Sequence, residues 1–263
     1  MTVFEHKLWG YELTYPDDWM HKAASDLEAF APYSESLKPA YEGPRLGHLM
    51  VRGEFNPQMQ PIDTLWNRHI AKLSVMLNAK KLGSAPLQFG GGTGYEVEIV
   101  LPKKDKKRLW VGILSYKTTI LHLMVLHLKE NRTWFEPLAS KIVASIRFLE
   151  WVNDIEVNRL GIPLPPDYVP TDPLKLIPDI SNPESWEGYD GSSDTGALQN
   201  FYLRELPVHG WDVIEYSPFP GSEEVNFARL RIHRDSTLAT IGILPTEEKH
   251  PTGKIMIKYD RTV

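Results

Sequence analysis

Three features of this sequence could carry chemistry: a glycine-rich stretch, nine histidines and several pairs of adjacent carboxylates. The stretch Gly90-Gly91-Gly92-Thr93-Gly94 would cradle a phosphate if a strand preceded it and a helix bearing a Lys-Ser or Lys-Thr pair followed it. A strand is predicted to follow instead, and no lysine is near. The stretch therefore indicates a turn, in which glycine supplies positive φ at little cost.

The histidines do not follow a metal-binding pattern. They are His6, His21, His48, His69, His122, His127, His209, His233 and His250. No HExxH is present, and no two lie four residues apart on a helix. His122 and His127 are five residues apart on one predicted strand and so point to opposite faces. We expect no metal site, and histidines that serve as core or edge residues.

The acidic pairs do not indicate acid–base catalysis, which needs two carboxylates converging on one pocket. The pairs are Asp17-Asp18, Glu223-Glu224 and Glu247-Glu248, all in predicted turns or loops. The chain also lacks cysteine and a Gly-x-Ser-x-Gly elbow. We expect no catalytic residue, no cofactor and no enzymatic activity. An enzyme would need a cleft that holds several of His21, His48, Asp17 and Asp18 together.

Composition is typical of a globular protein: 263 residues, 42% hydrophobic and 24% charged. The net charge of -5 argues against nucleic-acid binding. The longest apolar run, residues 120–128, is far shorter than the roughly 20 residues that span a bilayer. The first residues do not resemble a secretion signal. We expect no membrane insertion and, if Met1 is the natural start, a cytoplasmic location.

Residues 1–150 are predicted to form one α+β domain. Its helix at 61–78 has one wide apolar stripe, and the strand at 120–128 is apolar on both faces, so it should lie centrally in the sheet. Thr133 and Glu136 form a predicted capping box for a second helix that runs to about Ser145. Other predicted strands cover residues 10–15, 46–55, 93–102 and 109–116, with a charged hairpin tip at 103–107.

Residues 151–183 are predicted to be a proline-rich linker or strap. Its prolines and apolar side chains favour an extended segment that lies against one or both domains and fixes them relative to each other. Residues 184–263 should form a small α+β domain with a strand, a helix that Gly210 ends, and four antiparallel strands. The predicted fold class is α+β, with two domains that each pack one or two helices on an antiparallel sheet.

Four aromatic residues cluster near the start of the chain: Trp9, Tyr11, Tyr15 and Trp19. Most should belong to the core, since large aromatics dominate small cores. Any that are exposed would mark a binding patch, because tryptophan and tyrosine are enriched in interface hot spots. They are the candidate partner-binding residues.

The first 150 residues resemble the PsbP-like family. The resemblance rests on four segments: a hydrophobic strand with a Tyr-Pro-x-x-Trp opening at Tyr11–Trp19, the helix at 62–77, Gly91–Ile99, and the Ile-x-x-Ser-hydrophobic-x-Phe close at Ile142–Phe148. It implies a small α+β domain that binds other proteins and has no shared catalytic site. The family includes extrinsic photosystem subunits, a Ran-binding import factor, bacterial lipoproteins and chaperones of secretion effectors. In the second domain, Gly210-Trp211 after a helix resembles a module of bacterial accessory proteins.

Two functions from different classes follow. The preferred hypothesis is a non-catalytic accessory or adaptor protein that binds a protein partner or larger assembly. The alternative is a small-molecule or lipid-binding protein with a cavity between the helix at 62–77 and its sheet. The adaptable side chains Met50, Met59, Met76 and Met124 could line such a cavity. The sequence leaves the oligomeric state open.

Overall fold

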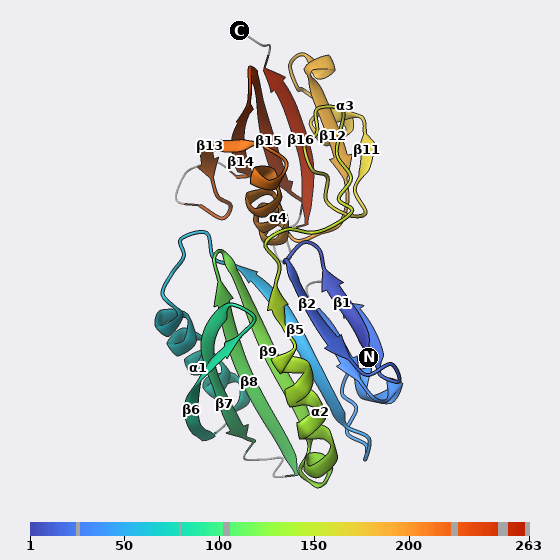
Figure 1. Cartoon of the computed structure of the whole chain (residues 1–263), viewed down its shortest axis with the longest axis vertical. Coiled ribbons are helices and arrows are strands. Elements are labelled where there is room, and N and C mark those ends of the chain that lie inside the picture. Colours follow the sequence, from blue (N-terminus) through green and yellow to red (C-terminus); the bar gives the residue numbers. More distant parts are fainter. Residues whose placement is uncertain (25–26, 79, 102–105, 222–225, 247–251, 261–263) are drawn as a thin grey trace. The chain divides into compact units, whose positions relative to one another are not determined.

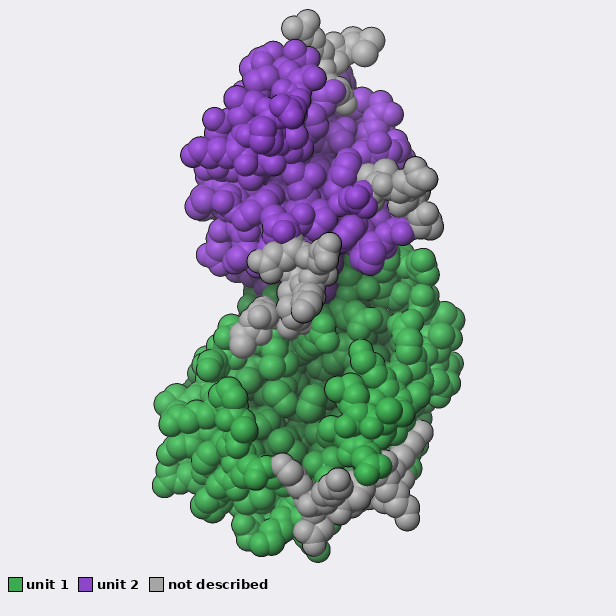
Figure 2. Space-filling view, turned by 180° about the vertical axis from the view of Figure 1, so that it is seen from behind, with its two compact units in different colours: residues 1–6, 11–149 green, residues 7–10, 150–263 purple. Residues whose placement is uncertain are grey.

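A computed structural model describes the chain except for residues 25–26, 79, 102–105, 222–225, 247–251 and 261–263. The chain divides into two compact units. Unit 1 comprises residues 1–6 and 11–149, and unit 2 comprises residues 7–10 and 150–263 (Figure 2). Both units combine helices with antiparallel sheets, so the predicted α+β class is confirmed. None of the described helices is long and apolar enough to cross a membrane.

The main sheet of unit 1 has seven strands in the order β3-β4-β5-β9-β8-β7-β6, all paired antiparallel (Figure 1). The strands are β3 Met20–Ala24, β4 Leu27–Ala31, β5 Gly47–Phe55, β6 Lys80–Phe89, β7 Gly92–Val100, β8 Lys107–Tyr116 and β9 Thr119–Leu128. β9 is the central strand, as its apolar character on both faces predicted.

Two helices cover opposite faces of this sheet. Successive side chains of the central strand β9 alternate between these two faces, so that some point towards one helix and some towards the other. The first helix, α1 Ile62–Leu77, packs on β7 and buries Leu65, Trp66 and Ile70. The second, α2 Arg132–Ala144, packs on β9 and β5 and buries Phe135 and Ile142 among others. The buried residues of α1 follow its predicted apolar stripe. In α2 the predicted stripe of Trp134, Leu138, Ile142 and Ile146 is only partly right, because Trp134 is 38% exposed and Phe135 is buried in its place.

A smaller sheet of three strands completes unit 1: β1 Thr2–His6, β2 Tyr11–Tyr15 and β10 Arg147–Phe148. It is joined to α2 by Ser145, whose hydroxyl accepts a hydrogen bond from Thr14 N at 2.9 Å. Two short 3-10 helices, Ser34–Leu37 and Lys129–Asn131, lie before β5 and α2.

The first two glycines of the glycine-rich stretch, Gly90 and Gly91, form the β6–β7 turn, and Gly92-Thr93-Gly94 begins β7. Gly90 and Gly91 have φ of 51° and 87°, in the left-handed region that favours glycine. A Cβ atom on Gly90 would lie 2.3 Å from the carbonyl oxygen of Ile146. The carbonyl oxygen of Gly90 also accepts a hydrogen bond from Phe148 N at 3.2 Å. The glycines therefore serve a turn that packs on the chain before β10.

Unit 2 has a six-stranded antiparallel sheet in the order β11-β12-β16-β15-β14-β13. Its elements are β11 Val169–Thr171, α3 Pro173–Leu176, a 3-10 helix Pro183–Ser185, β12 Trp186–Asp190, α4 Thr195–Val208, β13 Asp212–Ser217, β14 Ala228–Arg234, β15 Thr237–Pro245 and β16 Gly253–Asp260. Asp194 caps α4 by accepting hydrogen bonds from the next turn at 2.7 and 3.1 Å. Gly210 has a φ of 77°, which matches its predicted role after this helix.

The proline-rich segment predicted as a linker or strap belongs to unit 2 in the structure. Ile162 is fully buried in the core of this unit, and β11 pairs with β12. The hydroxyl of Tyr168 donates to Gly253 O at 2.7 Å, which joins the segment to the start of β16. The segment therefore adds a strand and core side chains to the predicted C-terminal domain.

Candidate functional site

Two cavities open on opposite faces of the seven-stranded sheet of unit 1. The α2 groove, about 230 Å³, lies between α2 and strands β6 to β9. The α1 cavity, about 380 Å³, lies between α1 and the sheet. His127 lines the first and His122 the second, so the two histidines point to opposite faces, as their spacing predicted.

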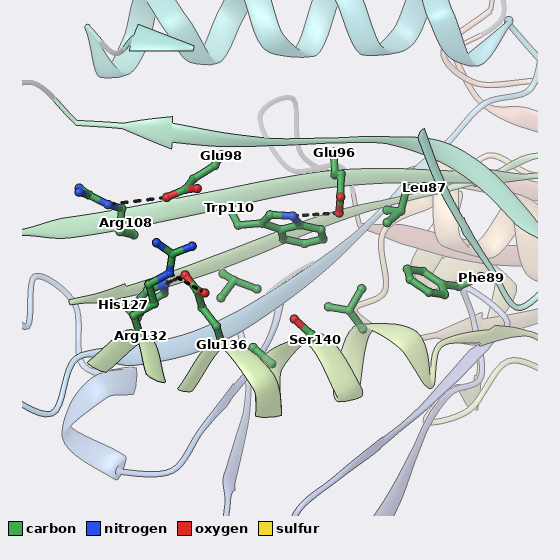
Figure 3. A pocket seen from close by; sticks show the side chains of 13 residues that line it. Leu87, Phe89, Glu96, Glu98, Arg108, Trp110, His127, Arg132, Glu136 and Ser140 are labelled. Atoms are coloured by element: carbon green, nitrogen blue, oxygen red, sulfur yellow. Dashed lines mark hydrogen bonds and ion pairs between the residues drawn. The ribbon is translucent and has the colours of Figure 1, made fainter. Parts of the chain in front are cut away.

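One wall of the α2 groove comes from neighbouring strands. Glu96 and Glu98 are two residues apart on β7 and so share a face with Arg108 and Trp110 of β8 (Figure 3). The indole Nε1 of Trp110 donates to Glu96 Oε2 at 3.0 Å. Arg108 Nε lies 3.6 Å from Glu98 Oε1. This wall therefore presents an indole hydrogen-bonded to one glutamate, and beside it an arginine–glutamate ion pair.

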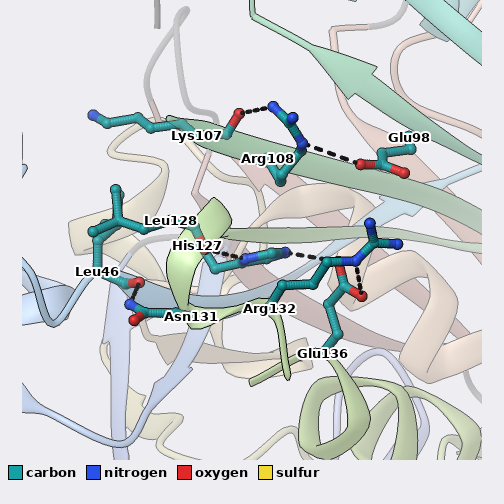
Figure 4. A network of polar contacts seen from close by, with 9 residues as sticks. All are labelled: Leu46, Glu98, Lys107, Arg108, His127, Leu128, Asn131, Arg132 and Glu136. Atoms are coloured by element: carbon teal, nitrogen blue, oxygen red, sulfur yellow. Dashed lines mark hydrogen bonds and ion pairs between the residues drawn. The ribbon is translucent and has the colours of Figure 1, made fainter. Parts of the chain in front are cut away.

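The opposite wall comes from α2 and β9, where three charged or polar side chains meet (Figure 4). Arg132 Nε donates to Glu136 Oε2 at 3.0 Å, and His127 Nε2 lies 3.2 Å from Glu136 Oε1. His127 Nδ1 lies 2.8 Å from the carbonyl oxygen of Leu128. Both ring nitrogens of His127 thus face oxygen atoms. Glu136 contacts both His127 and Arg132 at the groove.

This use of Glu136 corrects the predicted capping box. The helix α2 begins at Arg132, with Asn131 as its N-cap and no side-chain hydrogen bond at the cap. Because the helix begins earlier than predicted, Thr133 is already inside it and Glu136 lies too far along to reach the cap. The Asn131 amide instead donates to the carbonyl oxygens of Pro44 and Leu46, at 3.0 and 3.1 Å.

The α1 cavity has an apolar lining in which three of the four predicted methionines take part. Met50 comes from β5, Met76 from α1 and Met124 from β9. Met59 is 64% exposed and does not line it. The remaining apolar lining residues are Leu27, Leu65, Leu73, Val111, Ile113, Ile120 and Leu123.

The α1 cavity also has a histidine pair. The rings of His69 and His122 have centroids 4.6 Å apart, and His122 Nε2 lies 2.8 Å from Glu54 Oε2. This contact lowers the pKa of Glu54. Burial, and next the charge of His122, lower the pKa of His69 to about 4. The Nδ1 atom of His122 is buried without a hydrogen-bond partner among the residues that the structure describes.

Three cations also line the α1 cavity: Arg52 on β5, and Arg68 and Lys72 on α1. All three side chains belong to exposed residues, whereas the apolar Leu65 and Ile120 are buried. The cavity thus combines a buried apolar part with a cationic mouth.

The candidate partner-binding aromatics lie mainly in the interior. Trp9, Tyr11 and Trp19 are buried, and Tyr15 is half-buried. Trp19 stacks on Phe135 of α2 with a centroid distance of 5.5 Å. The three buried side chains therefore pack the cores of the units, as the sequence led us to expect for most of them. A role of any of the four in partner binding stays a prediction.

The residues whose convergence would indicate an enzyme have separate partners. His21 Nε2 lies 2.5 Å from Glu28, His48 Nδ1 lies 3.0 Å from Ser36 O, and the Thr2 hydroxyl donates to Asp17 at 2.8 Å. Neither cavity is lined by these residues or by Asp18. The pairs Glu223-Glu224 and Glu247-Glu248, and most of the charged tip at 103–107, lie outside the described residues.

Metal ligands do not gather in the described part of the chain. There, no group of three or more His, Asp or Glu side chains is placed to hold a metal ion. The three glutamates of the α2 groove do not meet this condition, because each faces an arginine, histidine or indole partner instead.

The sequence contains one pattern that belongs to the α2 groove, but the pattern alone does not identify a groove. Glu96 and Glu98 alternate with Val97 and Ile99, a pattern typical of a strand with one solvated face. In the structure, that polar face meets α2 across the groove. Only the pairing of distant elements distinguishes a lined groove from an ordinary solvated surface.

Comparison with known proteins gives matches among solved structures alone. No family model matches the chain, and no curated protein does. Similar structures include cyanobacterial PsbP from Synechocystis (12% identity, TM-score 0.43, covering 56% of this chain and 91% of that one). They also include LpqN of Mycobacterium tuberculosis (15%, 0.40, 56% and 90%) and the Ran-binding protein Mog1p of Saccharomyces cerevisiae (12%, 0.37, 56% and 95%).

These structures resemble the N-terminal part of the chain, where the sequence itself resembles the PsbP-like family. At these identities and TM-scores, the likeness concerns the fold and carries no argument about function. Any function must therefore be argued from the two cavities.

Proposed function

We propose that this chain is a non-catalytic accessory or adaptor protein that binds a protein partner through the α2 groove. The observation that carries this proposal is the indole of Trp110, which lies among Arg108, Arg132 and three carboxylates in an open groove. Tryptophan and arginine are the residues most enriched in interface hot spots. The groove offers a partner an apolar surface together with donors and acceptors.

The pairing of these charges supports binding over catalysis. Glu136 is shared by His127 and Arg132, and Glu96 accepts from Trp110. A general acid and base need carboxyl groups in environments that separate their pKa values. Here each of the three carboxylates faces an indole, arginine or histidine partner, and none is paired with another carboxylate. Such pairs at the rim of an interface give specificity and register to a bound partner.

A site-specific cross-link tests this proposal. A photo-reactive amino acid placed at Ser140, an exposed residue that lines the groove, should cross-link a discrete partner in native extract. The same amino acid at Lys141, the next exposed residue of α2 and not part of the groove, is the matched control. Charge reversal in Arg132→Glu should weaken the Ser140 cross-link several-fold, because it places a like charge beside Glu136.

Equal cross-linking from both positions would contradict the groove as the binding site. So would a Ser140 cross-link that Arg132→Glu leaves unchanged. Circular dichroism of each variant should match the parent protein, because all three positions are exposed and α2 retains its buried stripe.

A specific observation favours a second function, the binding of a small molecule or lipid in the α1 cavity. The cavity of about 380 Å³ lies between α1 and the sheet and is lined by Met50, Met76 and Met124. Ligand sites are concave, mostly apolar and carry a few polar groups, with volumes of roughly 300–1,000 Å³. Methionine adapts its shape to varied ligands. The binding experiment that tests this function accompanies the inference below.

A further inference from the structure

Among the described residues that line the α1 cavity, cationic side chains outnumber carboxylates. Arg68 and Lys72 are one turn apart on α1 and therefore lie on the same face of the helix. Arg52 adds a third cation from β5. Among the described residues that line the cavity, the single carboxylate is Glu54, and this group is already hydrogen-bonded to His122 at 2.8 Å. The mouth of the cavity is therefore cationic.

The inner part of the cavity is apolar. Leu65 of α1 and Ile120 of β9 are buried, and Leu73, Met50 and Met124 are half-buried. Filling this space with an alkyl chain would remove apolar surface from water on both sides, which contributes about 25 cal/mol for each Å². A polar solute would gain nothing from this surface.

We propose that the α1 cavity binds a single-chain anionic amphiphile, a deepening that rests on the second function proposed above. Its alkyl chain lies among Leu73, Met50 and Met124, and its anionic headgroup lies at Arg68 and Lys72. A cationic amphiphile of equal length would place like charges together. A neutral amphiphile would gain only the contribution of its buried alkyl chain. The headgroup charge therefore determines which amphiphile is preferred, and apolar burial provides the affinity that all three share.

The test measures binding of decanoate, decan-1-ol and decyltrimethylammonium by calorimetry, with the two ionic amphiphiles below their micelle concentrations and decan-1-ol below its solubility limit. Decanoate should bind the full chain tightest and the cationic amphiphile weakest. The double variant Arg68→Gln with Lys72→Gln should weaken decanoate binding roughly tenfold and leave decan-1-ol binding unchanged, because it removes two cations that attract a carboxylate and not a neutral hydroxyl. The matched control is Lys141→Gln with Arg147→Gln, two exposed cations outside the cavity.

A second pair of variants tests the cavity itself. Leu73→Trp places a large ring in the lining and should reduce binding of both decanoate and decan-1-ol. Val75→Trp on the same helix is its control, because Val75 is 83% exposed and does not line the cavity. All variants should keep the circular dichroism spectrum of the parent protein.

The outcomes separate the two proposals. Equal affinity for decanoate and decan-1-ol, with both reduced by Leu73→Trp, would overturn the anionic preference and leave the small-molecule function standing. Binding of none of the three, or binding that Leu73→Trp and Val75→Trp affect equally, would overturn both. A decanoate affinity that falls equally in the double variant and in its Lys141/Arg147 control would show a general charge effect and overturn the assigned headgroup position.

Discussion

At the scale of single residues, the imidazole of His69 is held neutral on the wall of the α1 cavity. Its pKa of about 4 results first from burial and then from the charge of His122, while Glu54 opposes the shift. The neighbouring charges that act on it are His122, Glu54, Lys72 and Arg52. In the unfolded chain the same group would titrate near 6.5. The folded protein therefore binds fewer protons at His69 than the unfolded chain does at mildly acidic pH.

This difference predicts a pH dependence of stability. Because the unfolded state takes up more protons, the free energy of unfolding should fall as the pH drops from 6.5 towards about 4, where this contribution is fully lost. Urea unfolding at about pH 7 and about pH 5 measures the fall. The variant His69→Gln lacks the titrating group, so it should lose less stability over this interval. Equal losses in both proteins would contradict a lowered pKa at His69.

At the scale of elements, residue patterns identify those with strong periodicity and miss those that depend on their neighbours. The helices α1 and α4 and the strands β5, β8 and β9 follow apolar stripes or alternation that the sequence makes visible. The strands β1, β3, β4 and β6 have weaker patterns, and β6 contains Gly83 and Pro86. Such strands form because a paired strand offers hydrogen bonds, which a local pattern does not encode.

The α2 groove depends on strand register in the same way. Glu98 lies opposite Trp110, and Glu96 lies opposite Gly112. A Cβ atom on Gly112 would lie 2.7 Å from the Trp110 ring, so the glycine leaves space for the indole to reach Glu96. The sequence predicts both strands, but it does not predict this diagonal contact or the helix that faces it.

The proline-rich segment gives a prediction at the element scale. Residues 161–183 should resist limited proteolysis, because Ile162 is buried and the Tyr168 hydroxyl bonds to Gly253 O and to Ser193 N. The variant Tyr168→Phe loses these hydrogen bonds, worth about 1 kcal/mol, and should be cut several-fold faster here. Rapid cleavage of the parent protein in this segment, with release of two stable halves, would show a flexible tether and refute the prediction.

At the scale of the whole molecule, unit 1 carries both cavities, and unit 2 has a separately packed core. The two cavities share one sheet and use its two faces for different chemistry: paired charges around an indole beside α2, and an apolar space with a cationic mouth beneath α1. We propose that the protein acts by holding a protein partner at the α2 groove.

The most direct test of this claim is purification of the full chain from its native source under mild conditions, with the mass of the recovered particle measured. We expect a stoichiometric complex with another protein, heavier than the 30.1 kDa of the chain alone. Arg132→Glu should reduce the recovered partner several-fold, whereas Lys141→Glu, an exposed position outside the groove, should not. Recovery of the chain only as a free monomer would contradict the account.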